Sequence, residues 1–231
     1  MRQRHHHSSA APNRLPEIRG ARIGTDEAGK GDYFGYLVIA AVYLEPDQDD
    51  SLREMGVRDS KRMSDSVVRR VAGTLKAQVA HDVVRISPSR YNELYAKLRN
   101  LNRLLAWGHA RAIENLLERA SAPLVVSDQF GDEQWLREAL MRKGRQVTLV
   151  QAPRAEQDSA VAAASILARS VFLETLEALS AEVKVSLPKG STHVIETARD
   201  LWRRGGEDLL GQVAKLHFRV TKSLRQVPMG D

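Results

Sequence analysis

One run of small and aliphatic side chains constrains the fold of this sequence more than any other feature. Residues 159–168 read Ser-Ala-Val-Ala-Ala-Ala-Ser-Ile-Leu-Ala, inside a segment that we predict to be helical from Glu156 to about Val183. Side chains this small let a helix lie close to a sheet. This run of small side chains therefore predicts a layered fold in which the helix packs directly on the strands of a sheet.

Asp158 begins this helix and has two interpretations. Helical spacing puts Asp158, Ala162 and Ser165 on one face, so close packing would bring Asp158 towards acids carried by strands. Alternatively, Asp158 is an ordinary acid in the first turn, where the helix dipole favours negative charge. Spacing alone favours the second interpretation, and it gives Ser165 a structural role.

Strand-like and helical segments alternate along the rest of the chain. The first strands form a meander, whereas the later strands alternate with helices, which indicates a mixed α/β architecture. We expect one large domain over residues 21–225, with tails at 1–20 and 226–231. The expected strands are 22–26, 36–44, 81–86, 123–128 and 146–151, and helices are expected at 101–117, 193–204 and 207–216.

Composition excludes several classes of protein. The 231 residues include no cysteine, which rules out a disulfide framework, a thiolate zinc site and a cysteine nucleophile. The absence of cysteine suits a reducing compartment, and we expect a cytoplasmic location. No uninterrupted apolar run reaches the roughly 18 residues of a membrane span. The net charge of +6 indicates an anionic partner such as nucleic acid.

Acidic residues stand at the ends of two predicted strands. Asp26 and Glu27 follow the first strand, and Asp128 follows a middle one. Neighbouring side chains on a regular strand point to opposite faces, so we expect the first strand to end or bulge at Asp26. Clustered carboxylates without His or Cys suit hard divalent cations. Two such ions about 3.5–4 Å apart can assist phosphodiester hydrolysis, and Asp26 is the best candidate to bridge them.

A short glycine-rich segment, Gly29-Lys30-Gly31, follows the acidic pair. It lacks the spacing of a Walker A loop or of a dinucleotide-binding loop. One interpretation is a flexible turn whose glycines supply positive φ. The other is a loop whose bare backbone approaches a phosphate or a sugar, which its position after the acids favours.

Several motifs resemble those of ribonuclease HIII, a branch of the type 2 ribonucleases H. The similarity begins in residues 24–35, Gly-Thr-Asp-Glu-Ala-Gly-Lys-Gly-Asp-Tyr-Phe-Gly, and covers about residues 22–222. The other motifs, in chain order, are Asp59-Ser60-Lys61, Asn100-Leu101-Asn102, Asp128-Gln129-Phe130, residues 155–169, Leu187-Pro188-Lys189-Gly190 and residues 213–218.

The resemblance implies an RNase H-like fold with a central mixed sheet flanked by helices and a helical C-terminal part. It also implies endonucleolytic cleavage of RNA in RNA–DNA hybrids, leaving 5′-phosphate and 3′-hydroxyl ends, with Mg²⁺ or Mn²⁺ as cofactor. Asp26, Glu27 and Asp128 match the metal-binding acids; Asp158 matches the fourth acid, and Glu156 is a second candidate. Gly29, Lys30 and Gly31 match a loop that contacts the RNA 2′-hydroxyl, and Ser60 and Lys61 resemble a substrate-backbone contact.

Further expectations concern substrate affinity, oligomeric state and specificity. The family usually carries an N-terminal substrate-binding domain, and only a short tail precedes the first motif here. Substrate affinity would then depend on the body of the enzyme, including basic residues of the C-terminal segment such as Lys215, and we expect a monomer without membrane association. The alternatives are ribonuclease HII-like cleavage at single ribonucleotides, against which the absence of tyrosine after Tyr95 argues, and a non-catalytic hybrid-binding module, against which the retained acids argue.

Overall fold

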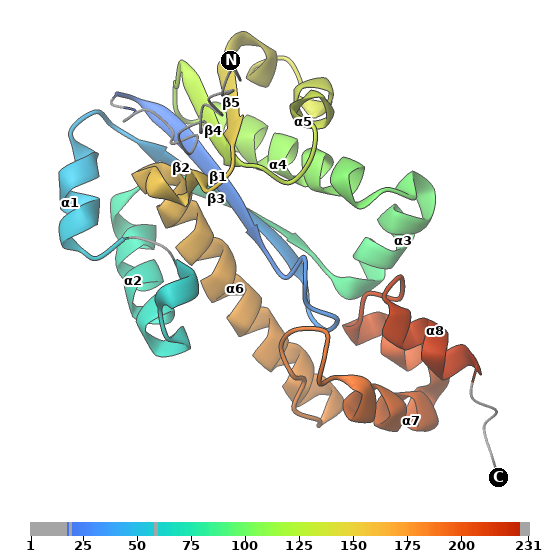
Figure 1. Cartoon of the computed structure of the whole chain (residues 1–231). Coiled ribbons are helices and arrows are strands. Elements are labelled where there is room, and N and C mark those ends of the chain that lie inside the picture. Colours follow the sequence, from blue (N-terminus) through green and yellow to red (C-terminus); the bar gives the residue numbers. More distant parts are fainter. Residues whose placement is uncertain (1–17, 19, 58–59, 227–231) are drawn as a thin grey trace, which may run out of the picture.

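The computed structural model describes residues 18, 20–57 and 60–226, and within them five strands form one sheet (Figure 1). The strand order is β3-β2-β1-β4-β5; β1, β2 and β3 are antiparallel neighbours, and β4 and β5 run parallel to β1. This mixed sheet confirms the predicted fold class. The strands are β1 (Arg22–Ala28), β2 (Leu37–Leu44), β3 (His81–Ile86), β4 (Leu124–Asp128) and β5 (Thr148–Ala152).

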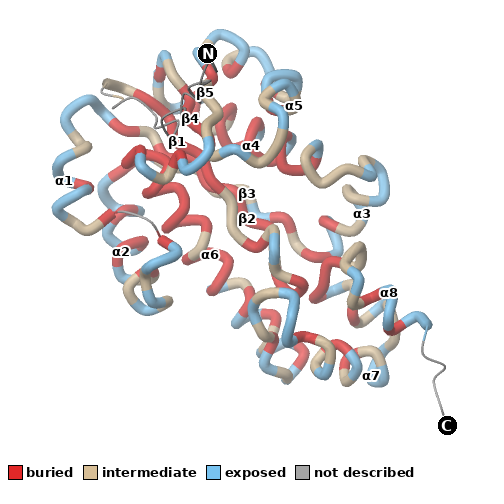
Figure 2. Tube along the Cα trace, in the orientation of Figure 1, coloured by how far each residue is buried: buried red, intermediate tan, exposed pale blue. Residues whose placement is uncertain are grey.

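Helix α6 (Ser159–Val183) is the main helix of one face of the sheet, where α1 (Gln48–Glu54) and α2 (Asp65–Gln78) lie beside it (Figure 1). A Cβ on Gly24 of β1 would come within 2.2 Å of the α6 backbone, so only glycine allows this approach. The small residues at 159–168 therefore do pack the helix closely on the sheet. By length and composition alone α6 is able to cross a membrane, but 83% of its most apolar window is buried inside the molecule (Figure 2).

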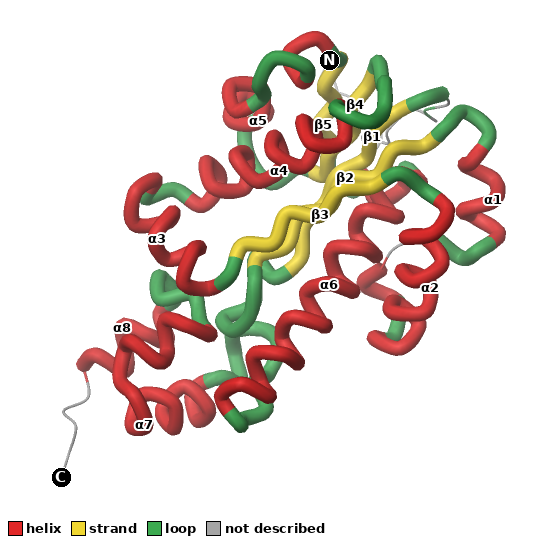
Figure 3. Tube along the Cα trace, turned by 180° about the vertical axis from the view of Figure 1, so that it is seen from behind, coloured by secondary structure: helices red, strands yellow, loops and turns green. Residues whose placement is uncertain are grey.

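Helices α3 (Pro88–Leu98), α4 (Leu101–Leu117) and α5 (Glu133–Ala139) cover the opposite face (Figure 3). The side chain of Asn100 accepts a hydrogen bond from the Arg103 amide and thereby caps the start of α4. Each face of the sheet has its own cluster of buried side chains, one built around α6 and the other around α4. The sheet is thus enclosed on both sides, and a site can open only at an end or edge of its strands.

The C-terminal helices α7 (Ile195–Val213) and α8 (Arg219–Gln226) lie together beyond one end of the sheet (Figure 3). Non-helical backbone at Gly205 and Gly206 divides α7, which agrees with two predicted helices at 193–204 and 207–216. Helix α8 was not predicted, and it includes Gln226, the first residue of the expected C-terminal tail. The remainder of that tail, 227–231, and residues 1–17 and 19 of the N-terminal tail lie outside the described residues.

Lys215 is not part of a basic surface, contrary to the sequence expectation. Its side chain is fully buried and donates hydrogen bonds to the carbonyl oxygens of Asp32 and Gly35, at 2.9 and 2.7 Å. Burial lowers the pKa of Lys215 to about 7. The lysine therefore fixes the C-terminal segment to the loop that follows β1.

Candidate active site

Strand β1 alternates its side chains between the two faces of the sheet. Arg22 and Asp26 face α6, where Asp26 is hydrogen-bonded by Ser165. Thr25 and Glu27 face α4. Pairing with β2 stays regular through Asp26, Glu27 and Ala28, so the expectation that the strand ends or bulges at Asp26 is wrong.

The acids meet where β4 separates from β1 and leaves an opening between the two strands, and β1 itself is not interrupted there. Parallel pairing between β1 and β4 ends at Thr25 and Ser127. Asp26 and Asp128 are the next residues on their strands, and they stand at equivalent positions on either side of the opening. Asp26, Glu27 and Asp128 line one cavity of about 410 Å³ there. The opening gives side chains from both faces of β1 access to the same space.

Asp26 is the most buried of these three acids. It is 9% exposed, and its Oδ1 accepts a hydrogen bond of 2.8 Å from the Glu27 amide. Burial, followed by repulsion from Glu27, raises the pKa of Asp26 to about 7. The hydrogen bond from Ser165 opposes this effect, whereas the charge of Asp128 adds to it. An unliganded Asp26 therefore holds a proton more readily than an ordinary aspartate.

Glu27 has the opposite electrostatic environment. Its Oε1 accepts from Lys30 Nζ at 2.7 Å, and its Oε2 lies 3.1 Å from Nε2 of His109. Burial alone would raise the pKa of Glu27, but the hydrogen bond and charge of His109, together with Lys30, lower it to about 2. The site thus contains one firmly ionised carboxylate beside one that carries a proton near neutral pH.

Asp128 is held by the backbone of a short helix. The Ala155 amide donates a 3.0 Å hydrogen bond to Asp128 Oδ1, and Ala155 begins the 3-10 helix η3 (Ala155–Gln157). Glu156 is the next residue, and it is half-buried. The second candidate for the fourth acid therefore stands one residue from a group that contacts Asp128.

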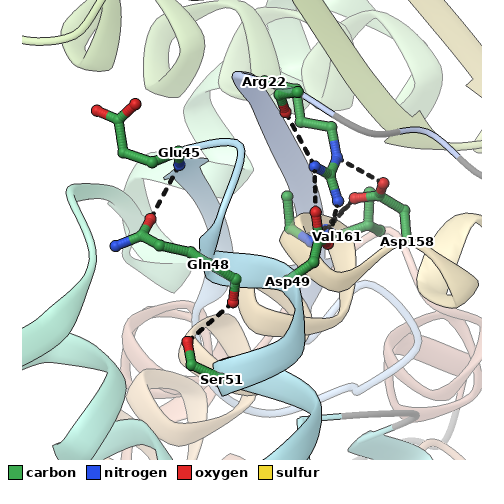
Figure 4. Close-up of polar contacts among 9 residues, drawn as sticks. Arg22, Glu45, Gln48, Asp49, Ser51, Asp158 and Val161 are labelled. Atoms are coloured by element: carbon green, nitrogen blue, oxygen red, sulfur yellow. Dashed lines mark hydrogen bonds and ion pairs between the residues drawn. The ribbon is translucent and has the colours of Figure 1, made fainter.

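Asp158 does not line the cavity, and the structure places it apart from Asp26, Glu27 and Asp128. Its Oδ2 accepts from Arg22 Nε at 2.7 Å, and its Oδ1 accepts from the amides of Ala160 and Val161, which caps α6 (Figure 4). Arg22 also binds Asp49 through both terminal nitrogens, at 2.9 and 2.5 Å (Figure 4). Asp158 is a helix cap and an ion-pair partner.

The direction of α6 explains this outcome. The helix runs alongside β1, from Asp158 beside Arg22 to Ser165 beside Asp26. Arg22 and Asp26 are four residues apart on a strand, which is about 13 Å. Close packing of the helix therefore brings Ser165, and not Asp158, to the carboxylate of Asp26.

The two glycines of the Gly29-Lys30-Gly31 loop have different roles. Gly29 has φ +85°, and a Cβ there would lie 2.1 Å from the Tyr36 carbonyl oxygen, so the fold itself requires this glycine. Gly31 has no atom within 4 Å of the place where a Cβ would stand. Lys30 and both glycines line the cavity. The open space at Gly31 leaves its backbone accessible to a bound molecule.

Basic side chains surround the acids. Lys30, Lys61, Arg169 and Lys189 all line the cavity, as does Ser60. The hydroxyls of Ser60 and Ser165 are 2.8 Å apart, and Arg169 donates to the Ser60 carbonyl oxygen. The predicted residues Ser60 and Lys61 thus reach the site, while Asp59 of the same motif lies outside the described residues. Cations around a carboxylate cluster suit a phosphate-bearing ligand.

The residues fit divalent cations that keep part of their shell for water and substrate. Within the described ranges no three Asp, Glu or His side chains stand close enough together to hold one ion. Magnesium is commonly bound by one or two carboxylates, with waters and substrate phosphates completing the octahedron. Asp26 and Asp128, whose charges repel across the cavity, supply such a pair of oxygen donors.

Four residues that line or support the site had no part in it assigned from the sequence. Ser165 was given a structural role, and His109, Arg169 and Lys189 carried no assigned role. Ser165 had a signal, because it is a polar residue within the apolar stretch of a helix that packs on the sheet. His109 had none, because 82 residues separate it from Glu27.

Comparison with known proteins gives the family of the chain. The family model described as Ribonuclease HII matches residues 23–221. Ribonuclease HIII of Protochlamydia amoebophila (strain UWE25) is 46% identical over 203 residues, which cover 87% of this chain and 67% of that protein. Ribonuclease HIII of Chlamydia pneumoniae is 43% identical over 203 residues, covering 86% of this chain and 68% of the relative.

A solved structure gives the same result for the fold. The crystal structure of Bst-RNase HIII in complex with Mn²⁺ superposes with a TM-score of 0.81 at 34% sequence identity, and the match covers 88% of this chain and 68% of that one. The family match spans β1 to α8 and so includes every element that carries a site acid. The chain therefore belongs to the ribonuclease HII family, and its similarity to curated relatives is to ribonuclease HIII.

Proposed function

We propose that this chain is an endoribonuclease that hydrolyses the RNA strand of RNA–DNA hybrids with the help of divalent metal ions, leaving 5′-phosphate and 3′-hydroxyl ends. One observation carries the proposal: Asp26, Glu27 and Asp128 line the same cavity as the Gly29–Gly31 loop. The cavity therefore combines oxygen ligands for hard cations with exposed backbone beside them. Its basic rim suits the phosphates of a nucleic acid.

The metal ions would be held by Asp26 and Asp128, with Glu27 beside them. Two bound divalent ions would supply activation of a water and stabilisation of the leaving 3′-oxygen. Ser165 orients the carboxylate of Asp26, and Ala155 orients that of Asp128. Lys30, paired with Glu27 at 2.7 Å and with a side chain that is 39% exposed, is free to turn towards a phosphate.

Recognition of RNA depends on the 2′-hydroxyl, which distinguishes RNA from DNA. The Gly29–Gly31 loop is the proposed contact because Gly31 presents bare backbone to open space. Ser60 and Lys61 would contact the substrate backbone from the other side of the cavity. The buried Lys215 holds the end of the same loop through the carbonyl oxygens of Asp32 and Gly35.

Glu156 is the better candidate for the fourth acid. Asp158 has both carboxylate oxygens engaged, one by Arg22 and the other by the first amides of α6. Within the described part of the chain no hydrogen bond or ion pair engages the Glu156 carboxylate, and Glu156 follows the residue that binds Asp128. Asp158 would have to leave a buried arginine to bind an ion, whereas Glu156 would not.

The experiment that tests the proposal compares three substrates. The purified protein is incubated with a continuous RNA–DNA hybrid, with a DNA duplex containing one ribonucleotide and with double-stranded RNA, using Mg²⁺ and Mn²⁺ in turn. We expect cleavage of the hybrid that Asp26→Asn and Asp128→Asn each abolish while the variants remain folded. Hybrid cleavage at the normal rate by either variant would refute the site.

The same experiment separates the alternatives. Preferential nicking at the single ribonucleotide would indicate ribonuclease HII-like specificity, and hybrid binding without metal-dependent cleavage would indicate a non-catalytic module. A cytoplasmic location and a monomeric state also belong to the proposal. The first is supported by the absence of cysteine, and size-exclusion chromatography with light scattering tests the second.

A further inference from the structure

His109 is a fully buried histidine next to the site. It belongs to α4, on the face of the sheet opposite α6, and its exposed fraction is 0%. Its ring nitrogens lie 3.1 Å from Glu27 Oε2 and 2.8 Å from Thr25 Oγ1. A side chain without access to solvent cannot touch a substrate, so any role in the reaction must act through these neighbours.

The hydrogen bonds define the direction in which His109 acts. An ionised carboxylate only accepts hydrogen bonds, so Nε2 of His109 carries a hydrogen and donates to Glu27. Nδ1 makes the second hydrogen bond, with the Thr25 hydroxyl, as acceptor in the neutral ring or as donor in the charged ring. Thr25 thus fixes the ring orientation, and the ring fixes one oxygen of Glu27. The other oxygen accepts a hydrogen bond from Lys30, whose side chain is 39% exposed.

The same ring also supports the segment that follows Asp128. The rings of His109 and Phe130 stack with their centroids 4.7 Å apart and their planes inclined by 16°. Phe130 stands two residues after Asp128, at the point where β4 has left β1. One imidazole therefore contacts both sides of the opening in which the acids meet.

We propose that His109 is a positioning residue that sets the affinity of the site for divalent cations, by holding the carboxylate of Glu27 and the segment after Asp128 in one arrangement. The inference rests on the proposed function, because it assigns to His109 an effect on the ions that Asp26, Glu27 and Asp128 would bind. Groups that orient metal-binding side chains typically change metal affinity or activity by about 10–100-fold when they are removed.

Two substitutions separate the hydrogen bond to Glu27 from the rest of the ring. The amide of His109→Gln reaches the position of Nε2 and can still donate to Glu27. The shorter amide of His109→Asn reaches only the position of Nδ1, on the Thr25 side. Both lose the stacking on Phe130, so a difference between them reports the Glu27 contact. Thr25→Val, which removes the hydroxyl and keeps the branched shape, tests the fixing of the ring.

The readout is Mn²⁺ binding to the free enzyme, measured by isothermal titration calorimetry without substrate. We expect His109→Asn to raise the Kd for Mn²⁺ by about 10–100-fold. His109→Gln should stay closer to the wild type, and Thr25→Val should shift the Kd in the same direction as His109→Asn. In cleavage assays the metal concentration for half-maximal rate should rise, and excess metal should restore much of kcat.

Glu114→Gln is the matched control for a general loss of stability. Glu114 is buried on the same helix, but it binds the amide of Gly144 at 2.8 Å, away from the cavity. We expect this variant to melt at a lower temperature with an unchanged Kd for Mn²⁺. If Glu114→Gln weakens Mn²⁺ binding as much as His109→Asn does, a general structural effect replaces the proposed role.

Other outcomes distinguish the inference from the proposed function. If His109→Asn and His109→Gln bind Mn²⁺ as the wild type does, while Asp26→Asn is inactive, the inference is wrong and the proposed function stands. If the wild type binds no Mn²⁺, or if Asp26→Asn cleaves the hybrid normally, both are wrong. Weaker binding in both His109 variants to the same extent would contradict the part assigned to the Glu27 hydrogen bond.

Discussion

Replacing Asp26 by asparagine should stabilise the metal-free protein while it abolishes cleavage. Burial, followed by repulsion from Glu27, raises the pKa of Asp26 from 3.8 to about 7. The folded state therefore binds a proton that the unfolded state releases between these two pH values. Stability falls as pH rises through this window and becomes constant above it. Asparagine keeps the shape and the amide contact without the charge.

The size of the effect follows from the shift. Each pKa unit corresponds to about 1.36 kcal/mol, so a carboxylate at this position costs up to about 4 kcal/mol at pH 8 and about 2 kcal/mol at pH 5. Asp26 is only 9% exposed, so solvent screens little of this energy. For a domain of this size, 4 kcal/mol is about 8–16 °C in Tm.

The assay is urea or thermal unfolding of the wild type and Asp26→Asn in EDTA, at pH 5 and at pH 8. The stability advantage of the variant should grow with pH, and added Mg²⁺ should stabilise only the wild type. Lower stability of Asp26→Asn than of the wild type at pH 8, or an advantage that does not depend on pH, would show that burial does not raise the pKa of Asp26 in this way.

Three other substitutions test separate parts of the site. Gly31→Ala should change the free energy of unfolding by less than about 0.5 kcal/mol, because a Cβ meets no atom there. Its kcat/KM for the hybrid should fall about tenfold through loss of a substrate hydrogen bond, and an unchanged kcat/KM would show that Gly31 does not contact the substrate. Asp158→Asn should destabilise the fold by about 1–3 kcal/mol in denaturation, through loss of the charged contact to Arg22, with kcat unchanged. A fully stable but inactive variant would show that Asp158 takes part in the reaction. Glu156→Gln should lower kcat by about a hundredfold with Tm unchanged, and full activity would exclude Glu156 as the fourth acid.

The sequence predicted those parts of the site that depend on local pattern. Asp26, Glu27 and Asp128 stand at or near the ends of strands, and strand ends are visible from the alternation of apolar residues. The small side chains at 159–168 predicted a helix packed closely on the sheet, which Gly24 permits. The fold class and the convergence of these acids on one cavity followed from these patterns.

The errors arose where the answer depends on how distant elements are placed. The meeting of Asp26 and Glu27 was attributed to a break in β1, but it is β4 that leaves the pair, and the sequence of β1 carries no trace of this. Spacing favoured a helix cap at Asp158 and the family resemblance matched it to the fourth acid, and the direction of α6 along β1, which the sequence does not give, brings Ser165 to Asp26 instead. Nothing in the local sequence marks Lys215 as buried, yet it is fully buried and donates to carbonyl oxygens of residues 32–35.

Anomalous diffraction from crystals of the protein grown with Mn²⁺ would locate the bound ions themselves. We expect manganese peaks in coordinating contact with the carboxylates of Asp26 and Asp128, and none at Asp158. Manganese bound only elsewhere, or bound between Asp49 and Asp158 with the cavity empty at saturating concentration, would contradict this expectation.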